Sequence, residues 1–224
     1  MERGCGVVDK FQDPLLTPKE TAKHLLIPRS TLDRWLREQV DGAPLVHRVE
    51  PDRRGWPSVP FVAVVEAYVL RSLRDLGLRM NKIRDAAEAV RREFNTPYAL
   101  ANRKISTDGV DIFLEYADGD MARVGDQQRP IRDFLNAHLR YINWDSSDGL
   151  ASSLKLRQYP DVAPVIIDPR FGWGAPVIEA NHVPVDAVVN MWLAGDSLKE
   201  VAYEYSLTTE QVESICRAAQ RVVA

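Results

Sequence analysis

Arginine and hydroxyl side chains gather in the segment that follows Ile27 and Pro28. Leu32, Trp35 and Leu36 recur there at three- and four-residue steps, which predicts a short helix with one buried face. Guanidinium and hydroxyl groups donate hydrogen bonds to DNA phosphates and to base edges. This spacing leaves Arg29, Ser30, Asp33, Arg34 and Arg37 facing outward. The candidate DNA-binding residues of the helix are Arg29, Ser30, Thr31, Arg34 and Arg37. Their arrangement is typical of a recognition helix that enters the major groove.

A second basic segment lies between Pro44 and Pro60. A β-type run from Leu45 to Val49, a turn rich in Asp, Arg and Gly, and a return through Trp56 and Val59 predict a hairpin. The candidate DNA-binding residues of this hairpin are Arg48 on its ascending arm, next to His47, and Arg53 and Arg54 at its tip. In a basic wing of this kind, guanidinium groups bind phosphates and contribute salt-dependent affinity rather than base identity.

Helix signals surround the two basic segments. Thr17 and Glu20 have the spacing of a capping box for a helix from Pro18 to about Leu26. The segment from residue 61 to 94 is predicted to form two helices that separate at Gly77. Two helices, a basic wing and a helix that ends in LRDLGLRMNKIRDA resemble the DNA-binding domain of MerR-class winged-helix regulators over residues 14 to 94. Helix pairs with a basic outer face also occur in proteins that never touch DNA, so that alternative stays open.

The middle of the chain, from residue 98 to 160, alternates short apolar runs with turns. Turn signals at Thr107-Asp108-Gly109 and at residues 117 to 120 predict a small antiparallel meander, and Pro130 would open a helix after it. The expected strands are Lys104 to Ser106, Val110 to Tyr116 and Met121 to Val124, with a further strand from Ser153 to Arg157. The local carboxylates fall in turns that select Asp for local hydrogen bonds, which disfavours a catalytic or metal role. These carboxylates are Asp108, Asp111, Asp118 and Asp120.

Three helices are predicted at the C-terminal end, the first from Pro184 to Ala194. Capping-box patterns begin the second and third helices, and they pair Ser197 with Glu200 and Thr208 with Gln211. The second and third helices have the pattern of a helix-turn-helix. Glu210 and Glu213 lie in the first part of its second helix, where DNA phosphates would repel them. We therefore favour a protein-interaction or dimerisation module over a second DNA-binding unit.

The C-terminal segment is also similar to a known family. It matches a small trihelical domain, formerly of unknown function and widespread in bacterial antitoxins, at Asp168-Pro169, residues 174–178, Val183-Pro184-Val185 and residues 194–197. Ala180-Asn181-His182 replaces a Gly-Thr-Arg element of that family, so any role of its arginine is lost. Together with the N-terminal segment, the whole chain resembles VapB-type antitoxins. The resemblance implies operator DNA and a PIN-like ribonuclease toxin as partners, and a homodimer that regulates its own transcription.

Composition and charge narrow the function classes. The 224 residues are 45% hydrophobic and 27% charged, and no apolar run approaches the length of a membrane span. We expect a cytoplasmic protein, without a signal peptide and with no membrane partner. Residues 1 to 97 carry 17 Lys and Arg against 14 Asp and Glu, a net charge of +3, whereas residues 98 to 224 carry 12 against 18, a net charge of −6. The two halves are therefore expected to bind different partners.

Residues that could carry catalysis or hold a metal are scattered. Cys5 and Cys216 lie near opposite ends of the chain, and the sequence shows no metal-ligand spacing, phosphate-binding loop or nucleophile elbow. We therefore expect no enzyme activity, no metal and no cofactor. The alternative function is a stand-alone MerR-like regulator that responds to a small molecule bound near Tyr116, Trp144 or Trp173.

These observations combine into one expected organisation. The fold class is α+β, mainly α, with a winged helix-turn-helix in residues 14–97, a central β-meander and helix that dimerise or link in residues 98–160, and a trihelical domain in residues 161–224. The expected function is that of an antitoxin in a type II toxin-antitoxin system, which represses its operator and neutralises a ribonuclease toxin by direct binding.

Overall fold

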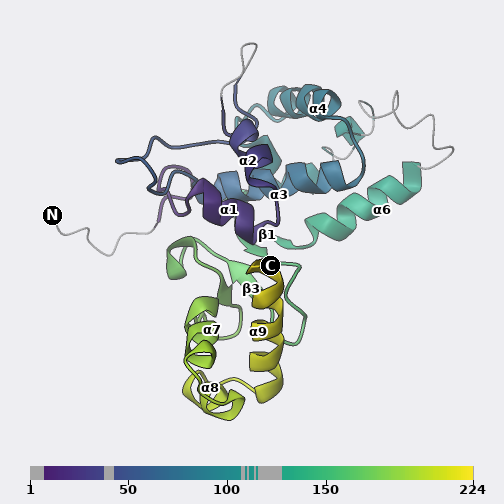
Figure 1. Ribbon diagram of the computed structural model, residues 1–224. Coiled ribbons are helices and arrows are strands. Elements are labelled where there is room, and N and C mark those ends of the chain that lie inside the picture. Colours follow the sequence, from purple (N-terminus) through teal and green to yellow (C-terminus); the bar gives the residue numbers. More distant parts are fainter. Residues whose placement is uncertain are drawn as a thin grey trace. The chain divides into compact units, whose positions relative to one another are not determined.

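The helices α1 to α4 occupy the first part of the chain (Figure 1). The structure is a computed structural model that describes residues 8–37, 43–106, 109, 111–113, 115 and 128–223. α1 (Pro18–His24) begins at a capping box in which Thr17 and Glu20 exchange hydrogen bonds, and α2 (Arg29–Trp35) follows a tight turn. α3 (Phe61–Asp75) and α4 (Met80–Glu93) separate at Gly77, whose φ of +85° suits glycine. The helices predicted for this part of the chain are thus confirmed.

The predicted meander is wrong at the residues that the structure describes. Lys104 to Ser106 belong to the 3₁₀ helix η2 (Arg103–Ser106), which follows η1 (Ala99–Ala101). Residues 109, 111–113 and 115 are helical, and the rest of the second and third predicted strands lies outside the described residues, as do Asp108, Asp118 and Asp120. Ile105, Gly109 and Phe113 are buried at four-residue steps, which is the spacing of a helix face. The helix expected after this segment is confirmed as α6 (Gln128–Leu139).

An antiparallel sheet is present, but later residues form it. Its strands are β1 (Ile142–Trp144), β2 (Ala151–Lys155), β3 (Val165–Ile167) and β4 (Val177–Ile178), in the order β1-β2-β3-β4. Leu154 pairs with Ile167 across β2 and β3, and Val165 pairs with Ile178 across β3 and β4. The strand predicted near Ser153 is therefore confirmed as β2. The sheet and the helices together confirm the expected α+β, mainly α, fold class.

The last three helices are α7 (Val185–Leu193), α8 (Leu198–Glu204) and α9 (Thr209–Val223), and they pack on one another (Figure 1). Their common core contains Val188, Val201, Val212 and Ile215, each of which is fully buried. The short 3₁₀ helix η3 (Gly172–Gly174) lies before β4. Both predicted capping boxes are confirmed, because the backbone and side-chain groups of Ser197 and Glu200, and of Thr208 and Gln211, exchange hydrogen bonds.

The chain folds into two compact units, neither of which is contiguous in sequence. The first unit contains Met1–Arg29, Val49–Phe61 and Ser153–Ala224, and the second contains Ser30–Arg48 and Val62–Ser152. The first unit therefore joins α1 to α7, α8 and α9, whereas the second contains α3, α4 and α6. The predicted domain boundaries after residues 97 and 160 stay a prediction. Among the described residues, every helix is too short or too polar to cross a membrane.

Candidate nucleic-acid interface

Local hydrogen bonds close the turn between α1 and α2. Leu26 adopts a left-handed φ of +51°, its N–H donates to the Lys23 carbonyl (3.2 Å), and the Ile27 N–H donates to the Ala22 carbonyl (2.9 Å). These two bonds form a Schellman motif, which ends α1. Pro28 cannot continue α1, but a helix can restart directly after it. The start of α2 is therefore determined by residues that are neighbours in the sequence.

α2 buries one face and exposes the other. Leu32, Trp35 and Leu36 are at most 5% exposed, and the Val46 N–H donates to the Trp35 carbonyl (3.1 Å) at the end of the helix. The opposite face carries the candidate DNA-binding residues of the helix, namely Arg29, Ser30, Arg34 and Arg37, which are exposed, and Thr31, which is half-buried. This is the exposure that a recognition helix needs, because side chains that bind a base edge must project from a packed support.

His47 lies inside the second unit rather than on an exposed wing arm. Its backbone N–H donates to Glu66 Oε2, and its Nδ1 lies 2.8 Å from both carboxylate oxygens of Glu66. Its ring also contacts Tyr98, with 4.6 Å between the ring centroids. Glu66 is fully buried in α3, and the only sequence signal for this contact is a single carboxylate in the apolar run FVAVVEAYV. Because a buried carboxylate needs hydrogen-bond donors, this contact anchors the base of the wing.

The wing is a loop rather than the predicted hairpin. Leu45 and Val46 are buried in bends and form no strand, and the two arms are joined by a hydrogen bond from the Val49 N–H to the Ser58 carbonyl (2.9 Å). The returning arm instead pairs with the residue before Thr17 and α1, through a bridge between Val59 and Leu16. The candidate DNA-binding residues of the loop, Arg48, Arg53 and Arg54, are all exposed.

The tip of the wing is internally ordered. The Trp56 N–H donates to the Arg53 carbonyl (3.1 Å) across a turn in which Gly55 has a φ of +88°. The Arg53 guanidinium lies over the Trp56 ring, 5.2 Å from its centroid, and Trp56 is 48% exposed. A cation over an aromatic face is attracted by the ring electrons, so this contact restricts the Arg53 side chain before any partner binds.

The C-terminal helices repeat the geometry of α1 and α2 at a spacing of 180 residues. Ser197 stands 180 positions after Thr17, and each begins its helix with a complete capping box. The turn is repeated as well, since Ser206, at the position of Leu26, has a φ of +53°. The Leu207 N–H donates to the Ala202 carbonyl (2.8 Å), as the Ile27 N–H does to the Ala22 carbonyl. α8 and α9 therefore form a second helix-turn-helix with the same local construction.

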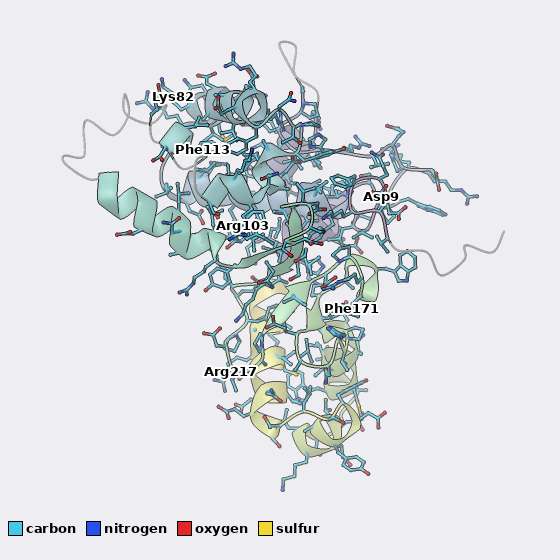
Figure 2. The ribbon with its side chains drawn as sticks, turned by 180° about the vertical axis from the view of Figure 1, so that it is seen from behind. Asp9, Lys82, Arg103, Phe113, Phe171 and Arg217 are labelled. Atoms are coloured by element: carbon cyan, nitrogen blue, oxygen red, sulfur yellow. The ribbon has the colours of Figure 1, made fainter. Side chains whose placement is uncertain are left out.

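The two helix-turn-helix units differ in the charge that they expose. Val212, Ile215 and Cys216 are buried in α9 at the positions of Leu32, Trp35 and Leu36 in α2. On the outer face, α9 has Glu210, Ser214 and Arg217 where α2 has Ser30, Arg34 and Arg37. Arg217 projects from α9 (Figure 2) and forms an ion pair with Glu213. With Arg29 and Asp33 of α2 set against Thr209 and Glu213 of α9, the five outer positions carry a net charge of +2 (three Arg, one Asp) in the first helix-turn-helix and −1 (one Arg, two Glu) in the second.

The described residues contain no candidate metal site and no exposed cysteine. No group of three or more His, Cys, Asp or Glu side chains in that part of the chain could hold a metal ion. Cys216 is buried, and this burial raises the pKa of its thiol, which disfavours the reactive thiolate. Cys5 lies outside the described residues.

Comparisons with known proteins agree with this arrangement. Residues 14–87 match a family described as "Putative DNA-binding HTH domain", and residues 165–217 match a "Protein of unknown function (DUF433)" family. The chain is 30% identical to "Putative antitoxin VapB45" of Mycobacterium tuberculosis, over 91% of this chain and 92% of that protein. The chain belongs to the VapB antitoxin family. The crystal structure of Rv2018 from Mycobacterium tuberculosis matches the antitoxin with a TM-score of 0.76 and 28% identity, and the match covers 94% of this chain and 98% of that one.

The two family matches cover both helix-turn-helix segments. The antitoxin carries a DNA-binding helix-turn-helix domain, and the matched residues include every candidate DNA-binding residue, from Arg29 to Arg54. The second family covers α7, α8 and most of α9, the helices that expose acidic side chains.

Proposed function

We propose that the antitoxin binds the operator of its own operon through α2 and the wing, and so represses its own transcription. The observation that carries this proposal is the contrast between two helices of the same local construction, because α2 has Arg29 and Arg34 where α9 has the neutral Thr209 and Ser214, and Glu210 of α9 replaces Ser30. Positive side chains gain affinity from phosphate neutralisation, whereas carboxylates lose it. Arg34 is exposed in the last turn of α2 and is the residue that we assign to base recognition.

In this proposal, the wing supplies phosphate contacts in the manner of a MerR-like winged helix. Arg48, Arg53 and Arg54 bind the backbone beside the groove that α2 occupies. A homodimer places two copies of α2 on an inverted-repeat operator, since a two-fold protein axis matches a palindromic site. The whole of this activity is non-enzymatic and takes place in the cytoplasm, where the operator lies.

The partner of the C-terminal part is, in our proposal, a PIN-like ribonuclease toxin that the antitoxin blocks by direct binding. The similarity to VapB45 supports a toxin as partner. Residues 98 to 224 carry a net charge of −6, and the exposed face of α9 includes Glu210 and Glu213. A nuclease that holds RNA presents a basic surface, to which this acidic half is complementary.

Two double variants separate the two proposed surfaces. Arg34→Ala with Arg37→Ala removes two exposed charges, one from α2 and one just after it, and Glu210→Lys with Glu213→Lys reverses two charges on α9. We expect the first variant to lose the mobility shift of the upstream DNA and to keep copurifying with the product of the neighbouring gene. We expect the second variant to do the opposite.

Each outcome bears on one surface. A first variant that still shifts the operator like the unchanged protein would remove α2 from the DNA interface. A second variant that still copurifies with the neighbouring gene product at moderate salt would remove α9 from the toxin interface. Circular dichroism of both variants controls for loss of folding.

A further inference from the structure

A cavity lies within the first unit, between α1, α7 and α9. Its volume is about 270 Å³. Val185 lines the buried floor, and Val189, Leu193 and Ala219 continue an apolar wall toward the surface. Helical residues of α7 and α9 thus form most of the apolar lining, and α1 of the DNA-binding domain closes the other side with Lys23 and His24. Neither half of the chain forms this cavity alone.

One end of the cavity is polar. His24 and Tyr159 line it together with Asp186, and Tyr159 is only 8% exposed. Burial lowers the pKa of the His24 imidazole to about 4 and raises the pKa of the Tyr159 hydroxyl to about 12, so both side chains are neutral at pH 7. The negative charge of Asp186 raises the pKa of both groups, which shows that they share the same end of the cavity.

The His24 imidazole and the Tyr159 hydroxyl can both form further hydrogen bonds. Among the described residues, none hydrogen-bonds to the imidazole of His24 or to the hydroxyl of Tyr159. Gln158 Nε2 donates instead to the backbone carbonyl of His24 (2.8 Å). The polar atoms of both side chains are accessible, because among the described residues only Arg91 Nε is a buried side-chain polar atom without a partner. The imidazole of His24 and the hydroxyl of Tyr159 can therefore bond to water or to a ligand in the cavity.

We propose that this cavity binds a small uncharged molecule with an apolar body and one hydroxyl group. A ligand hydroxyl donates a hydrogen bond to the neutral imidazole of His24 and accepts one from the Tyr159 hydroxyl. The apolar body packs against Val185, Val189 and Ala219. A charged ligand fits less well, because the charged side chains of the lining, Lys23 and Asp186, have opposite signs and sum to zero.

The proposed site differs from the region that the sequence suggested for a ligand. Trp173 is 70% exposed and Trp144 is half-buried, and neither of them lines the cavity. Tyr116 lies outside the described residues. A ligand in the cavity touches α1 and α9 at once, so its binding joins the helix-turn-helix domain to the C-terminal helices. The inference does not depend on the proposed toxin or operator.

A titration of the full-length antitoxin with two matched compounds tests the proposal. 4-Ethylphenol has the apolar body and the hydroxyl group, and ethylbenzene lacks only the hydroxyl. We expect 4-ethylphenol to shift amide signals of α1, α7 and α9 saturably in two-dimensional NMR spectra. We expect ethylbenzene to bind at the same place about fivefold more weakly, because it makes no hydrogen bond.

Matched variants locate the binding site. Ala219→Phe fills the cavity and should abolish the shifts. Tyr159→Phe should lower the affinity for 4-ethylphenol part of the way to that for ethylbenzene, because the hydrogen bond to His24 remains. Tyr203→Phe changes a tyrosine of α8 that is 89% exposed and should leave binding unchanged. Shifts that do not saturate, that map outside the three helices, or that survive Ala219→Phe in a folded protein would overturn the proposal. Equal affinity of the two compounds, or an unchanged affinity of Tyr159→Phe, would overturn the assigned polar end.

Discussion

Removal of both arginines from the tip of the wing tests the proposed DNA contact most directly. Arg53 and Arg54 are exposed, and the Trp56 ring already restricts Arg53. If each guanidinium neutralises one phosphate, Arg53→Ala with Arg54→Ala lowers the slope of log affinity against log salt concentration by about 1.8. Between about 50 and about 200 mM salt, the advantage of the unchanged protein over the variant should then fall by about 12-fold.

Fluorescence anisotropy with labelled upstream DNA, repeated at several salt concentrations, measures this slope. The same loss is expected on a scrambled duplex, because phosphate contacts carry little sequence information. Lys199→Ala removes an exposed positive charge from α8 and should leave the slope unchanged. Equal slopes for the wing variant and the unchanged protein would refute the placement of the wing on DNA. A loss confined to the operator sequence would assign the wing to base recognition instead.

Three further predictions concern single residues. Arg34→Ala should weaken operator binding by about 1 to 3 kcal/mol and reduce discrimination against scrambled DNA, as a competition assay measures; equal discrimination would exclude a base contact. His24 has a pKa lowered by burial, from 6.5 to about 4, so its contribution to stability is complete above pH 6.5 and is lost as the pH falls to 4. Urea titrations should show a loss of about 2 kcal/mol that His24→Gln removes, after allowance for partial exposure; the same loss in the variant would contradict this assignment. Gly174→Ala should lower the free energy of unfolding by about 2 to 3 kcal/mol, because Gly174 has a φ of +84° and a Cβ there would lie 2.6 Å from Leu15 Cβ. Gly195→Ala, with a φ of +109° and no atom within 4 Å of its Cβ, should cost only about 1 kcal/mol, and an equal cost at both sites would contradict the steric argument.

Helix ends were the most predictable feature, because their signals act over a few residues. The spacing of Thr17 and Glu20, and of Ser197 and Glu200, predicts capping boxes that the structure confirms. The exposed face of α2 was equally predictable, since the three-residue and four-residue steps of its apolar side chains leave Arg34 on the opposite side.

The failed meander shows where such local reasoning ends. Ile105 and Phe113 lie in short apolar runs beside turn residues, a pattern that fits both a strand and a buried helix. Burial at four-residue steps, which includes Gly109, shows that the helix is correct. The sequence pattern alone does not distinguish the two, because neighbours distant in the sequence decide which face is buried.

By itself, the sequence determined the helix-turn-helix units, the basic face of α2 and the acidic face of α9, since caps, turns and helix periodicity depend on residues within about four positions of one another. Only the tertiary structure decided that His47 turns to the buried carboxylate of Glu66 and that His24 and Tyr159 share one cavity. Those contacts join residues that are remote in the sequence, and packing within each unit, rather than local propensity, brings them together.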